Sequence, residues 1–420
     1  MNFTAHNDEI RKAMLDEINL ADMEDLFSHI PVKMKSLDLS DGLSEMAAQR
    51  QVKSISKKNR TDYISFMGGG CYNKFVPAAI SQVANRFEFL TAYTPYQPEI
   101  SQGTLQIMYE YQSMICMLTG MDVANASVYD GGSACAEAIA MACRISKKQK
   151  VLVSERLNPE YKEVIKTYTW GSGVDVEWFD SLPANTEDYG CVLVQNPDYY
   201  GEINSLPSVG TLLVVCTTLD SLALLQPPVE ADIVVGDIQT LGIPMSFGGP
   251  HAGFMACKEK YMRQLPGRLS GKTVDADGKT AYTLTLQTRE QHIRREKATS
   301  NICSNQALIA LSATLYLNLL GENGFKQAGI LSANNAHLLS EKLNDLGVVT
   351  ETKNFYNEFV IKVSDSDKIL EALKKNNILG GIKLDDNRIL VCATEMITDE
   401  DIDLYIDSVK SVLPGAILSH

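Results

Sequence analysis

The stretch Tyr129-Asp-Gly-Gly-Ser-Ala-Cys-Ala-Glu137 decides the fold, because it joins an apolar β-type run to a helix of small residues. The run Ala126 to Tyr129 ends at a turn in which Gly131 and Gly132 allow positive φ and close approach. The helix then presents free amides and its positive dipole end near Ser133, which suits an anion such as a phosphate. The spacing is not Gly-x-Gly-x-x-Gly, so a dinucleotide site is weakly supported, and a turn without a ligand remains an alternative.

Short apolar runs alternate with helical stretches on both sides of this turn, between about residues 61 and 305. Runs that are apolar throughout and separated by helices indicate a parallel sheet covered on both faces. We therefore predict an α/β domain with a mainly parallel sheet. The other runs are Val151 to Ser154, Val174 to Phe179, Cys191 to Gln195, Thr211 to Thr217, Ile233 to Gly236 and Gly253 to Ala256.

The two ends of the chain have different patterns. Residues 1–60 are polar and helix-rich, which predicts an N-terminal helical arm that is either solvated or wrapped around a partner subunit. Residues 306–420 begin with a long helix and continue as β-α-β-β-α, which predicts a small C-terminal α+β domain. The expected organisation is therefore an arm (1–60), a large α/β domain (61–305) and a C-terminal region (306–420).

Composition argues against several kinds of partner and site. The 420 residues carry 38 basic and 52 acidic side chains, and the net charge of −14 disfavours nucleic acid and anionic membranes. The nine cysteines contain no Cys-x-x-Cys pair and the six histidines are scattered, so we expect free thiols and no metal site. The N-terminus has no apolar signal-peptide core, and the run Ala307 to Leu320 is too short to span a membrane. We expect a soluble cytoplasmic protein.

Three further segments concentrate glycine or hydrogen-bonding side chains. Met67-Gly-Gly-Gly-Cys-Tyr72 permits backbone conformations that other residues resist, although a flexible loop would look the same. Tyr93-Thr-Pro-Tyr-Gln-Pro-Glu-Ile-Ser-Gln-Gly103 is stiffened by two prolines and rich in polar groups, which suits a ligand site or an interface. The segment Ile238 to Gly253 places His251 among glycines, where it has a structural or a functional role.

Together these segments resemble the glycine dehydrogenase (decarboxylating) P-protein family of the glycine cleavage system. The resemblance covers nearly the whole chain and matches the N-terminal half of a full-length P-protein, which is a separate alpha subunit in many prokaryotes. The segments that carry it are Phe66 to Gly70, Tyr93 to Gly103, Asp130 to Ser133, Gly236 to Gln239, Gly248 to Gly253 and Glu296 to Cys303.

The resemblance implies a fold, an activity and partners. The fold is that of the fold-type-I pyridoxal phosphate (PLP) transferases, and the assembly combines alpha and beta subunits, commonly two of each. The activity is the PLP-dependent decarboxylation of glycine, with transfer of the aminomethyl group to the lipoyl arm of the H-protein. Glycine, the H-protein and a beta subunit are therefore the implied partners.

The lysine that should hold PLP is missing from this chain. In the catalytic half of the family a His-Lys-Thr string precedes an Ile-Pro and a glycine-rich turn, whereas the matching stretch here is Ile238-Gln239-Thr240. A carboxamide cannot form an imine with an aldehyde. No lysine lies between Lys166 and Lys258, so a shifted register supplies none. The carboxylate expected at the ring nitrogen is also absent, since the family places it near Thr218.

We therefore expect no covalent PLP on this chain, and PLP on the beta subunit. We hypothesise that the loop carrying Tyr93, Tyr96, Gln97, Glu99, Ser101 and Gln102 faces the partner's PLP pocket. Nearby groups would be Arg294, Lys297, Thr299, Ser300 and Asn301. Gly131, Gly132 and Ser133 would form a vestigial phosphate-type loop, and His251 is a further candidate.

Two other functions and one other assembly remain open from the sequence. The chain could be a structural or regulatory scaffold for the beta subunit, or a self-sufficient PLP lyase or aminotransferase with an atypical lysine. A nucleotide-dependent dehydrogenase is disfavoured, because the phosphate fingerprint and the ribose-binding acid are missing. Without its partner the chain could form a homodimer through the uncovered interface.

Overall fold

The computed structural model describes residues 6–31 and 39–413, which fall into two compact units divided between Thr61 and Asp62. The first unit is helical, and the side chains of Asn7 and Ser44 cap its two α-helices by accepting hydrogen bonds from backbone N–H groups in the first turn. Its elements are α1 (Asp8–Glu17), the short 3₁₀ helix η1 (Glu24–Phe27) and α2 (Glu45–Ser56).

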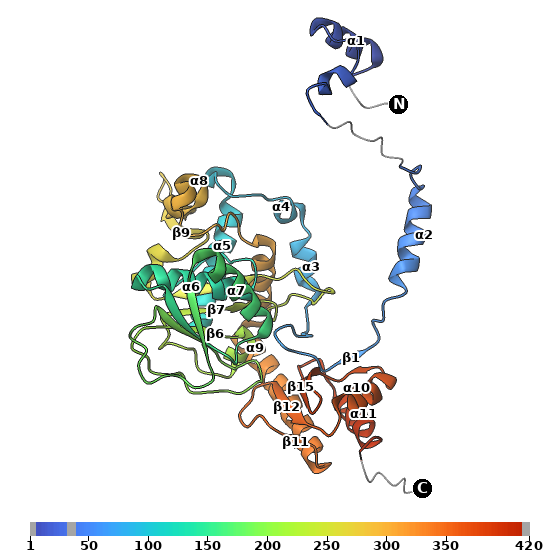
Figure 1. Ribbon diagram of the computed structural model, residues 1–420, viewed down its shortest axis with the longest axis vertical. Coiled ribbons are helices and arrows are strands. Elements are labelled where there is room, and N and C mark those ends of the chain that lie inside the picture. The colour runs from blue at the N-terminus through green and yellow to red at the C-terminus, as the bar shows by residue number, and fades with distance from the viewer. Residues whose placement is uncertain (1–5, 32–38, 414–420) are drawn as a thin grey trace. The chain divides into compact units, whose positions relative to one another are not determined.

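A seven-stranded sheet forms the centre of the second unit (Figure 1), in the order β2-β8-β7-β6-β5-β3-β4. The five strands from β7 to β4 pair in parallel, and β8 is antiparallel to both of its neighbours. The strands are β2 (Val123–Ala124), β3 (Lys150–Ser154), β4 (Asp175–Phe179), β5 (Cys191–Gln195), β6 (Leu212–Cys216), β7 (Ile233–Asp237) and β8 (Gly253–Cys257). The prediction of a mainly parallel sheet is confirmed.

One predicted strand is wrong. Of the run Ala126 to Tyr129, only Val128 pairs, with Gly253, as an isolated bridge. Ser127 has a φ of 107°, which interrupts the extended backbone that a strand requires. The side-chain oxygen of Asn125 accepts the N–H of Ser127 at 3.2 Å and so stabilises this turn.

Helices cover both faces of the sheet, because successive strand side chains point to opposite faces and both sets are apolar. On one face, α6 (Gly131–Ser146) and α7 (Pro159–Ser172) pack against buried side chains such as Val214. On the other face, α5 (Gln102–Thr119) and the start of α9 (Ala307–Asp345) pack around Val215. Alternate residues of β6 therefore contribute to two separate cores.

Short elements lie before α5, after β6 and after β8, and several of them surround the predicted loops. Residues 275–278 form the tip of the hairpin made by β9 and β10. These elements are α3 (Ala78–Ala84), α4 (Phe87–Leu90), η2 (Pro98–Ile100), η3 (Leu219–Ala223), η4 (Glu259–Gln264), β9 (Leu269–Val274), β10 (Thr280–Thr285), η5 (Gln287–Arg289), α8 (Gln291–Arg294) and η6 (Arg295–Lys297).

A second sheet follows α9, which kinks at Gly321, where φ is 59°. Its order is β11-β12-β15-β14, all antiparallel, and β13 pairs separately with β1 from far upstream. The elements are β1 (Ile64–Ser65), β11 (Val349–Thr350), β12 (Glu358–Lys362), α10 (Ser366–Lys375), β13 (Ile378–Leu379), β14 (Ile382–Asp385), β15 (Arg388–Cys392) and α11 (Asp399–Lys410). The three-part domain division stays a prediction. Among the described residues no helix is long and apolar enough to cross a membrane.

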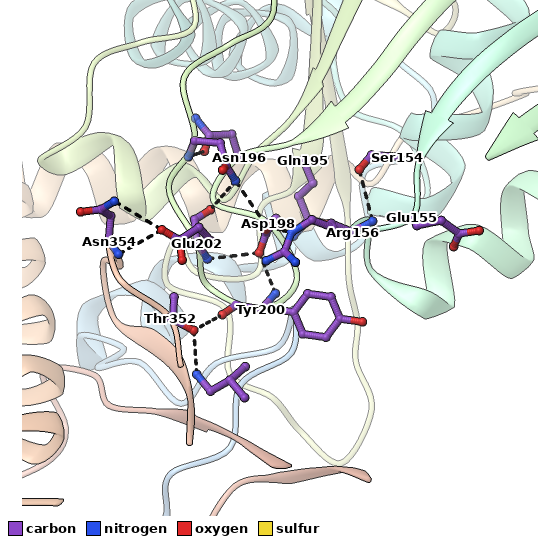
Figure 2. Close-up of polar contacts among 12 residues, drawn as sticks. Ser154, Glu155, Arg156, Gln195, Asn196, Asp198, Tyr200, Glu202, Thr352 and Asn354 are labelled. Carbon is purple, nitrogen blue, oxygen red and sulfur yellow. Dashed lines mark hydrogen bonds and ion pairs between the residues drawn. The ribbon is translucent and has the colours of Figure 1, made fainter. Parts of the chain in front are cut away.

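The loop after β5 connects the two sheets of this unit (Figure 2). Asp198 forms an ion pair with Arg156, and its Oδ1 accepts the backbone N–H groups of Tyr200 at 2.9 Å and Glu202 at 3.1 Å. The carboxylate of Glu202 in turn accepts the N–H of Asn354 at 3.1 Å. These contacts fix the second sheet against the carboxyl ends of the parallel strands.

Candidate functional site

The candidate site lies at the carboxyl ends of β5, β6 and β7, the edge of a parallel sheet where ligands usually bind. The cavity at this edge has a volume of about 20 Å³, which is enough for about one water molecule. It is lined by Gly70, Tyr72, Asn158, Tyr161, Gln195, Cys216, Thr217, Thr218, Asp237, Gln239 and Thr240. The side chains that fill this edge therefore decide what it can hold.

Gln239 is buried, with 1% of its surface exposed, and its amide is fully used inside the chain. Its Nε2 donates to the carbonyl oxygens of Tyr72 and Ile243, both at 2.9 Å. Its Oε1 accepts the backbone N–H of Tyr72 at 2.9 Å. At the position predicted for the PLP lysine, the carboxamide thus fastens the glycine loop (residues 67–72) to the sheet.

Glu358 on β12 holds the same glycine loop from the other side. Its Oε1 accepts the N–H of Gly69 at 2.6 Å, and its Oε2 accepts the hydroxyl of Tyr72 at 3.0 Å. A Cβ at Gly68 would lie 2.1 Å from Oε1 of this carboxylate, so only glycine fits there. Burial raises the pKa of Glu358 to about 7.

The predicted phosphate-type loop is occupied by carboxylates of the chain itself. The N–H of Gly131 donates to Oδ2 of Asp237 at 3.2 Å, and the N–H of Ser133 donates to Oδ1 of Asp130 at 2.7 Å. His251 lies with its Nδ1 3.3 Å from the same Oδ2 of Asp237. Hydrogen bonding to Asp237, and then to Cys71, raises the pKa of His251 to about 10, so the imidazole is cationic at neutral pH.

A buried lysine does lie in this unit, but its charge is already paired. Lys74 Nζ is 3.0 Å from Oδ2 of Asp220 and 2.9 Å from Oε2 of Glu395, and it donates to Ser332 Oγ at 3.1 Å. Asp220 is therefore an ion-pair partner of Lys74, and Thr218 at the cavity carries no carboxylate.

The residues at this edge do not fit PLP. The cavity is about the size of one water, and Gln239 stands where the lysine is expected. The amides of Gly131 and Ser133, which would hold a phosphate, donate to Asp237 and Asp130 instead.

The tyrosine loop, defined here as residues 93–102, is by contrast mostly open to solvent. Tyr93 is 89% exposed and Tyr96 is 42% exposed, and Gln97 and Glu99 are also exposed. Ser101 is half-buried and starts α5, where its carbonyl accepts the N–H of Leu105 at 3.0 Å.

Gln102 ends the tyrosine loop and is turned inward. Its Nε2 donates to the carbonyl oxygens of Pro98 at 2.7 Å and Tyr282 at 2.9 Å. Its Oε1 accepts the N–H of Tyr282 at 2.8 Å. This amide therefore anchors the loop to β10.

Arg268 holds the tyrosine loop in place and was missed by the sequence reasoning. It is 4% exposed, and its Nη2 donates to the carbonyl of Cys303 at 2.8 Å, to Thr94 Oγ1 at 3.3 Å and to the Tyr96 hydroxyl at 3.4 Å. The guanidinium also lies over the Tyr96 ring, 5.4 Å from its centre. No local pattern marks a Pro-Gly-Arg segment as the partner of residues some 170 positions away.

The remaining candidates lie in the segment that Arg268 ties to this loop. The Tyr96 ring lies 5.4 Å from that of His292, two residues before Arg294. Ser300 Oγ donates to Oε1 of Glu137 at 2.8 Å, and Asn301 is exposed. Three others, Arg294, Lys297 and Thr299, line a separate cavity.

Comparison with known proteins places this architecture in one family. The family model described as glycine cleavage system P-protein matches residues 1–409. A Desulforamulus reducens protein named probable glycine dehydrogenase (decarboxylating) subunit 1 is 45% identical, and the match covers 96% of this chain and 98% of that protein. A Thermotoga maritima protein of the same name is 44% identical, with 97% and 99% covered.

Solved structures agree with this placement. The structure described as glycine decarboxylase (P-protein) of the glycine cleavage system, in inhibitor-bound form, has a TM-score of 0.89 and 39% identity, and the match covers 98% of this chain and 100% of that one. A Lactobacillus brevis glutamate decarboxylase, with a TM-score of 0.65 and 11% identity, shares the fold alone. The predicted fold-type-I architecture is confirmed. The chain belongs to the glycine cleavage system P-protein family.

Proposed function

We propose that this chain is the lysine-free subunit of a two-subunit glycine decarboxylase, in which a second subunit binds PLP and the lipoyl group of the H-protein accepts the aminomethyl group. The observation that carries the proposal is the buried amide of Gln239, whose three hydrogen bonds close the cofactor edge of the sheet. The relatives named "subunit 1" support a partner, because the name implies a second subunit.

The tyrosine loop is the part of this chain that we assign to the partner's active site. Tyr93 and Ile100 expose 89% and 80% of their surface, and exposed apolar groups of this size gathered in one loop are typical of a contact surface. Arg268 holds Thr94 and Tyr96 in one arrangement before any partner binds. Ordering the loop in advance lowers the entropy cost of assembly.

In the proposed complex, Tyr96, Gln97, Glu99 and Ser101 contribute polar groups near the glycine site and help to exclude water. Tyr96 is the first of these to test, because its hydroxyl meets Arg268 while 42% of the residue stays exposed. The roles of Arg294, Lys297, Thr299, Ser300 and Asn301 in that site also remain proposals.

The test is glycine–bicarbonate exchange in the presence of H-protein, measured for this chain alone, the partner alone and the mixture. We expect turnover only in the mixture, and activity of this chain alone would overturn the proposal. In the mixture at saturating partner, Tyr96→Ala should lower kcat at least tenfold, while Trp170→Ala, an exposed aromatic on α7, should not. An unchanged kcat for Tyr96→Ala would remove Tyr96 from the partner's active site.

A further inference from the structure

A cationic cavity lies beside the segments η4, η5, α8 and η6. It is separate from the tyrosine loop and from the small cavity at the carboxyl ends of β5, β6 and β7, which we call the closed pocket. Its volume is about 280 Å³, more than ten times that of the closed pocket. Four of its lining side chains are cations, and two others are threonines. The lining residues are Arg263, Gln264, Leu286, Thr288, Arg289, Arg294, Lys297 and Thr299.

None of these four cations has a carboxylate partner within 4.0 Å in the part of the chain that the structure describes. Among the acids nearby, Glu137 accepts a hydrogen bond from Ser300 at 2.8 Å, and Glu290 lies 3.6 Å from His292. The other carboxylate oxygen of Glu290, Oε1, is buried and has no hydrogen-bond partner among the described residues, so its charge acts on the neighbouring Arg289 without forming an ion pair within 4.0 Å. The chain as a whole has a net charge of −14, so a cavity whose charged lining residues are all cations is not a consequence of its composition. Mutual repulsion among these charges would be relieved by an anion.

Arg289 supplies a second, independent indication of a ligand. Its Nε donates to the carbonyl of Leu286 at 3.0 Å, and its Nη2 donates to that of Gly267 at 2.9 Å, so the guanidinium is fixed in position. Its Nη1 is buried and has no hydrogen-bond partner. A buried donor without a partner costs about 1–3 kcal/mol, and an acceptor within reach of this nitrogen would remove that cost.

The chemistry of the lining selects among anions. Guanidinium groups bind phosphate and carboxylate through paired N–H donors, and the Thr288 and Thr299 hydroxyls can donate as well. Four cations around one cavity favour a dianion over a monoanion, because each adds to the attraction. We propose that this cavity is a binding site for a dianionic phosphate group, either inorganic phosphate or a small phosphomonoester. The proposal rests on the cavity of this chain alone, although Arg294, Lys297 and Thr299 are also among the groups proposed to lie near the partner's glycine site.

The test measures the binding of inorganic phosphate and of glycerol 3-phosphate to the full chain by calorimetry, at constant ionic strength set with chloride. Arg263→Gln combined with Lys297→Gln removes two exposed cations of the cavity without removing a hydrogen bond within the fold. The matched control, Lys326→Gln with Lys410→Gln, removes the same charge from exposed positions on α9 and α11. Melting temperature confirms that both double variants fold.

We expect the control to bind phosphate like the unmodified chain and the cavity variant to bind at least tenfold more weakly. Binding of both ligands would identify a phosphomonoester site, and binding of inorganic phosphate alone a site for the free ion. Equal weakening in both variants would mean general charge attraction, and absence of binding to the unmodified chain would mean that the cavity does not take phosphate. Either result would overturn the proposal.

Discussion

The closed pocket under Gln239 and the tyrosine loop are opposite in their use of hydrogen-bonding groups. In the pocket, the amide of Gln239, the carboxylate of Asp237 and the amides of Gly131 and Ser133 all bind one another or the nearby backbone. In the loop, Tyr93 is 89% exposed, and the Tyr96 hydroxyl meets one buried cation. Most of the polar groups of the closed pocket are buried and paired within the chain, whereas most of those of the tyrosine loop lie at the surface.

This difference indicates that the tyrosine loop, and not the closed pocket, is the region available to a ligand or a partner. In the pocket, Gln239 and Asp237 are hydrogen-bonded within the chain, Thr240 Oγ1 is buried without a partner among the described residues, and the remaining volume has room for about one water molecule. A rigid surface loop with free polar and aromatic groups is available to another protein. The fold of a PLP transferase is thus retained as a scaffold for the loop that we assign to the partner's active site.

The largest effect should come from Gln239→Lys, which restores the lysine at the closed pocket. The change leaves the N–H and C=O of Tyr72 and the C=O of Ile243 without partners and buries a charge, so we expect a loss of about 3–5 kcal/mol. Urea unfolding measures it. The control Gln106→Lys, exposed on α5, should change stability by less than ~0.5 kcal/mol. A stable variant that forms a Schiff base with PLP would show that the pocket can open.

The next effect concerns the anchor of the tyrosine loop. Arg268→Met removes a buried guanidinium that donates to Thr94, Tyr96, Cys303 and Asn305, and we expect a loss of about 2–3 kcal/mol. Hydrogen exchange should increase in residues 93–101 and remain unchanged in β7. The exposed Arg86→Met should leave the stability close to that of the unmodified chain, because its pair with Glu88 is on the surface. Unchanged exchange in the loop would contradict the positioning role of Arg268.

Glu358→Gln should alter the pH dependence of stability at the closed pocket. The folded-state pKa of about 7 lies above the ordinary value of 4.5, so the folded chain holds the proton more tightly. The protonation of Glu358 therefore adds to the free energy of unfolding. This contribution is fully present below pH 4.5, is lost as the pH rises through 7, and amounts to about 3 kcal/mol as an upper limit. Unfolding curves between pH 4 and pH 8 should therefore fall more steeply for the unmodified chain than for the variant.

The control for this prediction is Glu371→Gln, an exposed glutamate on α10. Its curve should parallel that of the unmodified chain. If Glu358→Gln also leaves the slope unchanged, the carboxylate does not titrate in the folded chain between these pH values.

The smallest effect on stability should come from Tyr93→Ser at the exposed loop. Its side chain contributes little to the core, so we expect a change below ~0.5 kcal/mol. The affinity for the partner subunit should nevertheless fall about tenfold or more, because exposed tyrosines at interfaces often carry much of the binding energy. Analytical ultracentrifugation of the mixture measures this, with Trp170→Ser as the control. Equal affinities of the Tyr93→Ser and Trp170→Ser variants for the partner subunit would show that Tyr93 does not contribute to the interface.

Much of the fold was predictable because its signals are local. Apolar runs of four to seven residues predicted the parallel strands. The family resemblance pointed to Gln239, and the lysine-free span between Lys166 and Lys258 supported that assignment. The predicted strand at Ala126 to Tyr129 was wrong because Ser127 adopts a positive φ, which no local sequence pattern indicates.

The partners of the site residues were not predictable. Glu358 holds Gly69 across 289 positions, and Arg268 holds Tyr96 across 172, so each pair exists only after the sheets have packed. Lys74 was also missed, because its partners Asp220 and Glu395 are both far from it in the sequence. Sequence patterns located the loops but not the buried charges that fix them.

The central claim is that this chain cannot bind PLP covalently, and borohydride reduction of the assembled enzyme with PLP tests it most directly. Reduction converts a Schiff base into a stable lysine adduct, which peptide mass mapping assigns to a chain and a residue. We predict that the adduct is found on the partner subunit and on no peptide of this chain. A phosphopyridoxyl-lysine in this chain at stoichiometric yield, at Lys74 or elsewhere, would contradict the account.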